Sequence, residues 1–278
     1  MKKFHFLLLI ASLAIVIATS CNKEENKVSI YGTNTEKALI NPTFLSECYN
    51  LADYHNAVLT FVGNNCVPNV NNRETRFNLA QKYMGTANVW NASKVIIDTI
   101  QYFVENGGAA NAIATLGVFS DTAILILQQI ENVYNQALAE DSIIFTPKQF
   151  LGSLYAIADY VITNHNVEYN NITGITNEYG VIIAMCVLAE ASYNFWYAQL
   201  MDIKGDWHDL IMPGGGPVGN YCKGAIKRAA VDAWAYVSAW YDDNSTPVGA
   251  TVTITSGGHT WDSTTAAAAA SAASAACK

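Results

Sequence analysis

The chain has 278 residues, of which 51% are hydrophobic and 14% charged, and its formal net charge at pH 7 is −8. Typical globular domains carry about 25% charged residues, so this composition excludes a disordered, highly charged chain. The acidic balance also argues against nucleic acid as a partner, because nucleic acids are bound by basic patches.

Residues 1–20 have the order of a secretory signal peptide. Lys2 and Lys3 give a positive start, an apolar segment runs from Phe4 to Ile17, and residues 18–20 are small. The apolar segment has roughly 14 residues, fewer than the roughly 20 that a membrane-spanning helix needs. We therefore expect cleavage, and the loss of Lys2 and Lys3 takes the formal charge from −8 to −10.

The residues around Cys21 resemble a lipid-attachment signal. Ala18–Cys21 resembles the lipobox of bacterial lipoproteins, in which the mature protein begins at an acylated cysteine. Asn22–Glu25 resembles the short acidic export tag of surface-exposed lipoproteins of the Bacteroidetes. The resemblance implies an outer-membrane lipoprotein, exposed at the cell surface and held to the membrane by lipid on Cys21. The alternative is an ordinary signal peptide followed by a coincidental cysteine.

Three segments are expected: a cleaved signal peptide (1–20), a lipidated flexible tether (21–41) and one helical domain (42–278). The domain is predicted to be mainly α and bundle-like, from apolar residues at spacings of three and four and from start signals such as Thr146-Pro147. The predicted helices cover 43–63, 74–84, 92–105, 120–139, 147–164 and 225–241.

The most apolar segment, Asn177–Leu200, is long enough to span a bilayer. It contains Glu190, Ser192 and Asn194, and a central helix surrounded by the others explains the same composition. We expect the central helix.

The last third of the chain is less regular. Residues 209–224 are predicted to form a glycine- and proline-rich loop. Within residues 246–261, Val252 and Ile254 alternate with threonines, and Gly257-Gly258 follows as a turn. This pattern predicts a small β-hairpin near the C-terminus. The alanine-rich tail, 266–276, has high helix propensity and nothing bulky to bury.

Two segments echo each other: YNLADYHN at 49–56 and YAIADYVITNHN at 155–166. One hypothesis joins their histidines with a carboxylate in a metal or acid–base site, because imidazoles and carboxylates serve both chemistries. The residues concerned are His55 and His165 with Asp53, Asp159 or Glu190. The alternative is structural and is favoured here, because no H-E-x-x-H motif is present and His55 lies on an apolar helix face.

A third histidine, His208, lies in the sequence GDWHD beside Trp207, in a segment expected to be an exposed loop. It could hold a metal ion or a sugar, or belong to an ordinary solvated turn. His55, His165 and His208 are thus the candidates for an enzyme site, and no cofactor is predicted.

The segment Cys48–Leu59 also resembles the His-Asn-x-x-Leu helix of an uncharacterised group of helical Bacteroidetes lipoproteins. The last part of those proteins is rich in alanine and glycine, as is the last part of this chain. The group brings no established activity.

Six cysteines are present, and lipid on Cys21 leaves five, so at least one stays unpaired within the chain. Cys48 and Cys186 lie at apolar helix positions and are expected to be buried thiols. Cys66 and Cys222, both expected in loops, are the predicted disulfide.

Four short segments, at 98–100, 121–123, 141–143 and 262–264, match the Asp-Ser/Thr-apolar pattern that Bacteroidetes use for O-glycosylation. The candidate acceptors are Thr122 and Ser142, which should lie near helix boundaries. An Asp-Thr pair is also an ordinary helix start.

The expected function is that of a lipid-anchored lipoprotein, facing the cell surface or the periplasm, that has no identified biochemical activity and acts by binding or scaffolding, with a protein or a glycan as the candidate partner. One alternative is a hydrolase-type or metal-dependent enzyme that uses the three histidines with carboxylates. Another is a secreted toxin or bacteriocin-like effector whose alanine-rich tail enters a target membrane.

Overall fold

The computed structural model describes residues 42–66, 73–84, 102–103, 106–115, 117–139, 147–167, 169–170, 174–175, 177–202, 207, 218–245, 254–256 and 259–261. Cys21, Ser142 and His208 lie outside these residues. So do the predicted signal peptide, the tether, the alanine-rich tail and most of the helix predicted for 92–105.

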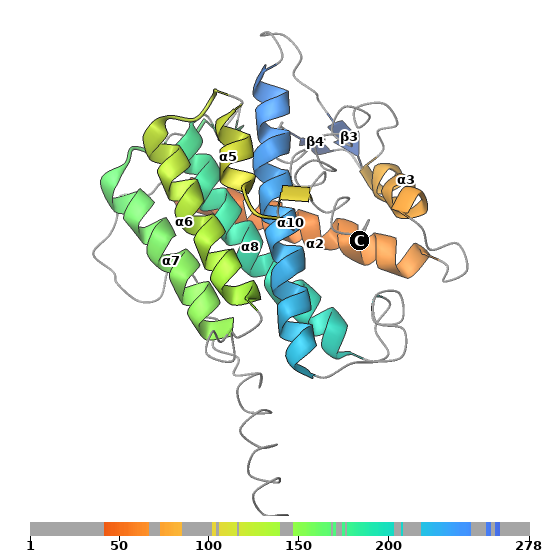
Figure 1. Cartoon of the computed structure of the whole chain (residues 1–278). Coiled ribbons are helices and arrows are strands. Elements are labelled where there is room, and N and C mark those ends of the chain that lie inside the picture. The colour runs from red at the N-terminus through yellow and green to blue at the C-terminus, as the bar shows by residue number, and fades with distance from the viewer. Residues whose placement is uncertain are drawn as a thin grey trace, which may run out of the picture.

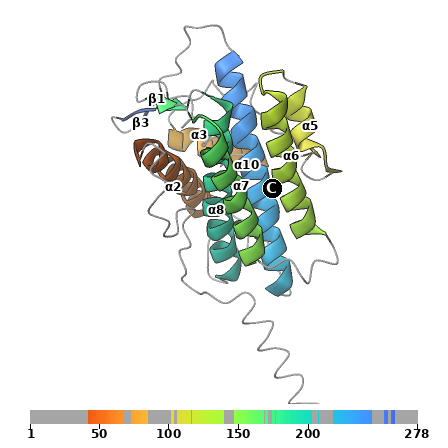
Figure 2. The ribbon, with the colours of Figure 1, turned by 90° about the vertical axis from the view of Figure 1, so that its left-hand side faces the viewer.

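The domain is mainly α, as predicted. Its described helices are α2 (Pro42–Asn65), α3 (Arg73–Met84), α5 (Ala109–Ala114), α6 (Asp121–Leu138), α7 (Pro147–Asn164), α8 (Glu178–Met201) and α10 (Val218–Ser245). α6, α7, α8 and α10 run side by side, and α2 crosses this group obliquely, as Figures 1 and 2 show. The short α5 packs on α6, and α3 packs on α2.

Helix α8 is the predicted central helix. Every residue from Gly180 to Ala189 is buried, so this half of the helix has no solvent-facing side. The helices around it are α10, α2, α7 and α6. Among the described residues α8 is the one helix long and apolar enough to cross a membrane, and 67% of its most apolar window is buried in the domain. The packing of α8 in the core of the domain therefore accounts for its apolar composition.

α8 and α10 run antiparallel along a close seam. Gly224 approaches Leu200, the guanidinium of Arg228 lies over the ring of Trp196, and Asp232 accepts a hydrogen bond from Ser192. These pairs advance by four residues on α10 and retreat by four on α8, so one face of each helix meets the other at every turn. α10 presents alanines at 225, 229, 230 and 233, all buried, and such small side chains let two helix axes come close.

The helix starts follow local chemistry. The Ser120 hydroxyl accepts a hydrogen bond from the N–H of Ala123 at the start of α6. Ser120 also donates its own N–H to Glu178 at 2.6 Å, which joins the starts of α6 and α8. α7 begins at Pro147, as predicted.

α5 was not predicted, and its start depends on a distant carboxylate. Gly107 and Gly108 have φ values of 81° and 95°, a left-handed turn that glycine adopts without strain. Glu131 of α6 then accepts the N–H groups of Ala109 and Ala110, at 2.8 and 3.2 Å. A carboxylate there satisfies donors that a helix start leaves open.

Residues 218–224 belong to α10, which corrects the predicted loop over 209–224. Gly224 is compatible with the helix because it packs beside Leu200.

The described strands form two short antiparallel pairs. Strand β1 (Tyr169–Asn170) pairs with β2 (Gly174–Ile175), and β3 (Ile254–Ser256) pairs with β4 (His259–Trp261). A pair of strands of two or three residues is marginally stable by itself. The small β-hairpin near the C-terminus, as a stable part of the domain, therefore stays a prediction.

Trp207 is buried, although it was expected in an exposed loop. Its Nε1–H donates to the carbonyl of Leu59 at 3.1 Å, and its ring lies against Gly63. A Cβ at residue 63 would come within 2.5 Å of that Nε1. Only glycine therefore allows the indole to lie against α2.

A Gly63→Ala substitution is expected to displace Trp207 and break its bond to Leu59. Overpacking of this kind costs about 1–3 kcal/mol of unfolding free energy, measurable by urea titration. Gly152→Ala is the control, because nothing lies within 4 Å of a Cβ at this exposed α7 position. There alanine should stabilise the helix by about 1 kcal/mol. Equal effects of the two substitutions would contradict the close contact.

Candidate functional site

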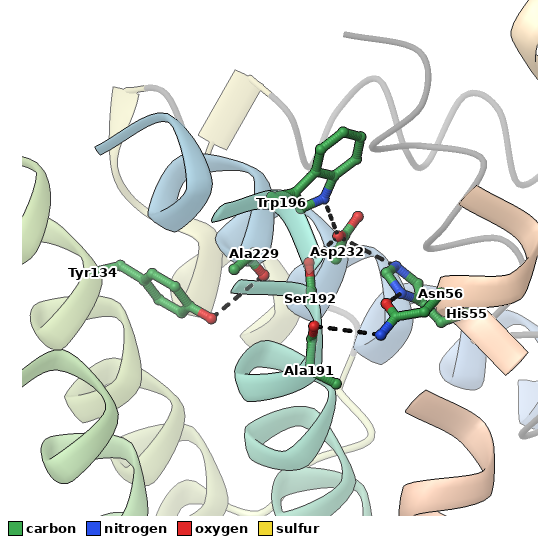
Figure 3. A network of polar contacts seen from close by, with 8 residues as sticks. All are labelled: His55, Asn56, Tyr134, Ala191, Ser192, Trp196, Ala229 and Asp232. Carbon is green, nitrogen blue, oxygen red and sulfur yellow. Dashed lines mark hydrogen bonds and ion pairs between the residues drawn. The ribbon is translucent and has the colours of Figure 1, made fainter. Parts of the chain in front are cut away.

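A polar cluster lies inside the apolar core, where α2, α8 and α10 meet. It consists of His55 from α2, Ser192 and Trp196 from α8, and Asp232 from α10, all buried. Figure 3 shows the three other side chains pointing at the Asp232 carboxylate. We call these four residues the Asp232 cluster.

One oxygen of Asp232 receives all three contacts. The Ser192 hydroxyl donates to Oδ2, and the Trp196 Nε1–H donates to the same atom at 3.1 Å. Nε2 of His55 lies 3.2 Å from Oδ2. An isolated carboxylate is expensive to bury, and the Ser192 and Trp196 donors replace part of the water that it loses on folding.

Asn56 fixes the ring of His55. Its Oδ1 lies 3.0 Å from Nδ1 of His55, and its Nδ2 donates to the carbonyl of Ala191 at 3.4 Å. This second bond runs from α2 to α8, so the His-Asn pair holds the crossing of two helices as well as the imidazole (Figure 3).

Ser, His and Asp are the side chains of a nucleophilic triad, but here they contact one another in a different pattern. In a triad the serine hydroxyl bonds to histidine, which takes its proton, and the aspartate orients the histidine. Here the Ser192 hydroxyl donates to Asp232 instead. Both the hydroxyl and the imidazole belong to fully buried side chains. This arrangement stabilises a fold rather than activating a nucleophile.

The structure does not assemble the predicted histidine–carboxylate site. Asp53 and Asp159 are exposed, and His55 contacts Asp232 instead. His165 stacks on Tyr179, with 4.1 Å between ring centroids. Within the described residues no three His, Cys, Asp or Glu side chains form a group that could hold a metal ion.

Sequence reasoning missed Asp232 as the partner of His55. The available signal was an acidic residue within AAVDAWAYV, a run that is otherwise small or apolar. An ionisable side chain in such a run is either paired or functional. Trp196 is buried in the core and also donates a hydrogen bond to Asp232.

Glu190 forms a separate contact between α8 and α7. The Tyr155 hydroxyl donates to its Oε1 at 2.7 Å. Its Oε2 is buried and accepts no hydrogen bond from the described residues. Burial raises the pKa of the Glu190 carboxyl, and the bond from Tyr155 partly opposes this.

The described cysteines are thiols. Cys48 and Cys186 are buried, as expected, and burial raises the pKa of Cys186 to about 12. Cys66 and Cys222 are buried too and are not joined, which corrects the predicted disulfide. Cys222 lies inside α10 rather than in a loop, so its direction is set by the helix. Burial raises the pKa of Cys66, and the nearby Arg76 guanidinium opposes this.

Thr122 is exposed in the first turn of α6, beside a helix boundary as expected. An acceptor there would be accessible to a modifying enzyme, and the glycosylation itself stays a prediction.

Comparison with known proteins finds no family model, no curated protein and no solved structure that matches the chain. The functional conclusions therefore depend on the residues and on their geometry.

Replacing Asp232 by alanine is expected to be severely destabilising. The change leaves the Ser192 and Trp196 donors without their shared acceptor and His55 without its contact, and each buried donor left unsatisfied costs about 1–3 kcal/mol. Thermal and urea unfolding measure the loss. The control is Asp53→Asn, at an exposed α2 position, expected within about 0.5 kcal/mol of wild type. A mild effect of Asp232→Ala would mean that the cluster is not a major determinant of stability.

Glu190→Gln should raise stability at neutral pH relative to wild type. Because the folded-state pKa lies above its ordinary value of 4.5, the contribution of Glu190 to stability is full below that value. It is lost as pH rises through the folded pKa, where the buried carboxylate ionises. The glutamine variant has no such loss and still accepts the Tyr155 hydroxyl bond. Urea titrations at pH 4 and pH 7 should show the stability difference growing with pH; a constant difference would contradict the shift.

Proposed function

We propose that the chain is a lipid-anchored lipoprotein whose helical domain acts as a binding or scaffold protein outside the inner membrane, at the cell surface. The single observation that carries the binding interpretation is the Asp232 cluster. Among the described residues, the Ser192 hydroxyl and the His55 imidazole both contact one buried carboxylate oxygen that joins three helices, and there they serve the packing of the fold.

The anchor half of the proposal is supported by the order of the N-terminal residues. Lys2 and Lys3, the apolar run and Ala18–Cys21 follow the lipobox pattern, and Asn22–Glu25 follow the acidic export pattern. Two or three acyl chains, at about 0.8 kcal/mol per buried CH₂, give a durable anchor. The domain then begins at Pro42, the first residue of α2. We further propose that residues 42–278 form one domain, with a small β-hairpin near its C-terminus.

The enzyme alternative would depend on His208, because His55 and His165 contact Asp232 and Tyr179. Zinc, iron or manganese that copurifies with the protein and is lost on His208→Ala would favour it. The toxin alternative depends on the tail at 266–276, which lies outside the described residues. Loss of target-cell killing on deletion of the tail would support it.

The anchor is tested by a Cys21→Ser variant, expressed in cells that are fed labelled palmitate. The variant should take up no label and should leave the detergent-extracted membrane fraction, because serine cannot form the thioether. Cys66→Ser is the matched control and should be labelled like wild type, since its thiol is buried in the domain. Continued labelling of the Cys21→Ser protein would refute the anchor.

A further inference from the structure

Arg228 is a mostly buried cation on the α8–α10 seam. Its guanidinium carbon lies 5.3 Å from the centre of the Trp196 ring, and its Nη1 donates to the carbonyl of Gly224 at 3.2 Å. Its Nε is buried and makes no hydrogen bond with the described residues. A guanidinium carries five donors, and among the described residues this one has a single hydrogen-bond acceptor, the Gly224 carbonyl.

Charges of both signs act on Arg228. Asp232 favours the charged form of Arg228, and Arg76 of α3, itself buried, disfavours it. Asp232 already receives the contacts of its own cluster through Oδ2, and no carboxylate of the described residues forms an ion pair with Arg228. Burial first, and Arg76 as a lesser cause, lower the pKa of Arg228 to about 10, so it remains charged at neutral pH.

A buried arginine with no ion pair among the described residues is unusual in a chain whose formal charge is −8. Arginines are seldom buried without an anionic partner, because desolvating the charge costs several kcal/mol. The planar fork of a guanidinium matches the two oxygens of a carboxylate or phosphate, which makes arginine the usual residue for holding such groups. Arg228 is only partly exposed, and Lys227 beside it is exposed, so an anion could approach from solvent.

We propose that Arg228, backed by Trp196 and together with Arg76, forms a binding site for an oxyanion, the phosphate or carboxylate group of a ligand. Trp196 holds the guanidinium plane by cation–π stacking, and Arg76 adds a second positive charge. This inference goes beyond the proposed function, which names no ligand, and it does not depend on the lipid anchor.

The test is a titration of the full chain, purified in detergent, with inorganic phosphate or with acetate. Sodium chloride at matched ionic strength controls for screening. A bound anion stabilises only the folded state, so the melting temperature should rise by a few degrees and then saturate. A rise with phosphate alone assigns a phosphate ligand, and a rise with acetate alone assigns a carboxylate. No saturable rise with either anion would overturn the proposal.

Three variants locate the site. Arg228→Met keeps the apolar stem on Trp196 and should fold, because it removes a buried charge that has no carboxylate ion pair. It should weaken anion binding at least tenfold. Arg228→Lys keeps the charge without the fork and should weaken it by an intermediate factor, which gives a second measurement if the methionine variant folds poorly. Lys227→Gln removes the same charge from the adjacent exposed residue and should bind as wild type does. Unchanged binding by both Arg228 variants would place the anion elsewhere and refute the assignment.

The outcome is independent of the anchor experiment. Failure to bind anions would leave palmitate labelling at Cys21 untouched, and loss of labelling in Cys21→Ser would leave anion binding by the domain untouched.

Discussion

The arrangement of this domain depends on one buried carboxylate. Asp232 lies buried in the core, where two donors from α8 and the imidazole of His55 from α2 converge on one of its oxygens. These contacts come from α2 and α8, so the requirement to satisfy one buried carboxylate sets where three helices meet. Apolar packing alone would allow many relative positions of α10 against α8, since alanines on the seam interlock weakly. The polar contacts select one of them.

Trp196 extends this constraint outward. Its indole N–H faces Asp232, its ring face lies beneath Arg228, and its ring meets Trp207 nearly edge-on, with 5.0 Å between centroids. Trp207 in turn is held by Leu59 and by the absence of a side chain at Gly63. One aromatic ring therefore links the Asp232 carboxylate, the mostly buried Arg228 guanidinium and the end of α2. The fold positions Arg228 as a consequence of solvating Asp232.

Much of the fold was open to sequence reasoning, because its signals are local. Pro147 and Ser120 mark helix starts through backbone geometry and capping, and the uninterrupted apolar run of α8 indicates a helix buried on all sides. What escaped prediction depends on contacts between distant residues. α5 requires Glu131 from another helix, the first turns of α10 contain glycines that would elsewhere suggest a loop, and Trp207 is buried only because Gly63 makes room for it.

The candidate site shows the same division. His55 could be singled out from its apolar face, but its partner could not, since nothing in the local sequence relates residue 55 to residue 232. The echo between 49–56 and 155–166 suggested a pairing of histidines that the fold does not make. Arg228 gave no local signal, because what sets it apart is a buried Nε with no hydrogen bond and no ion pair among the described residues, which only a three-dimensional arrangement reveals.

The four-residue steps of the α8–α10 seam also bear on how this chain can change in length. A residue inserted in α8 between Ser192 and Trp196 would rotate every later side chain by about 100°, turning Trp196 away from Asp232 and Leu200 away from Gly224. Substitutions along the seam act one contact at a time, whereas a single insertion would separate one half of the seam from the other. Length variation in related chains should therefore be confined to the connections between helices, and α8 and α10 should keep their spacing wherever the fold is kept.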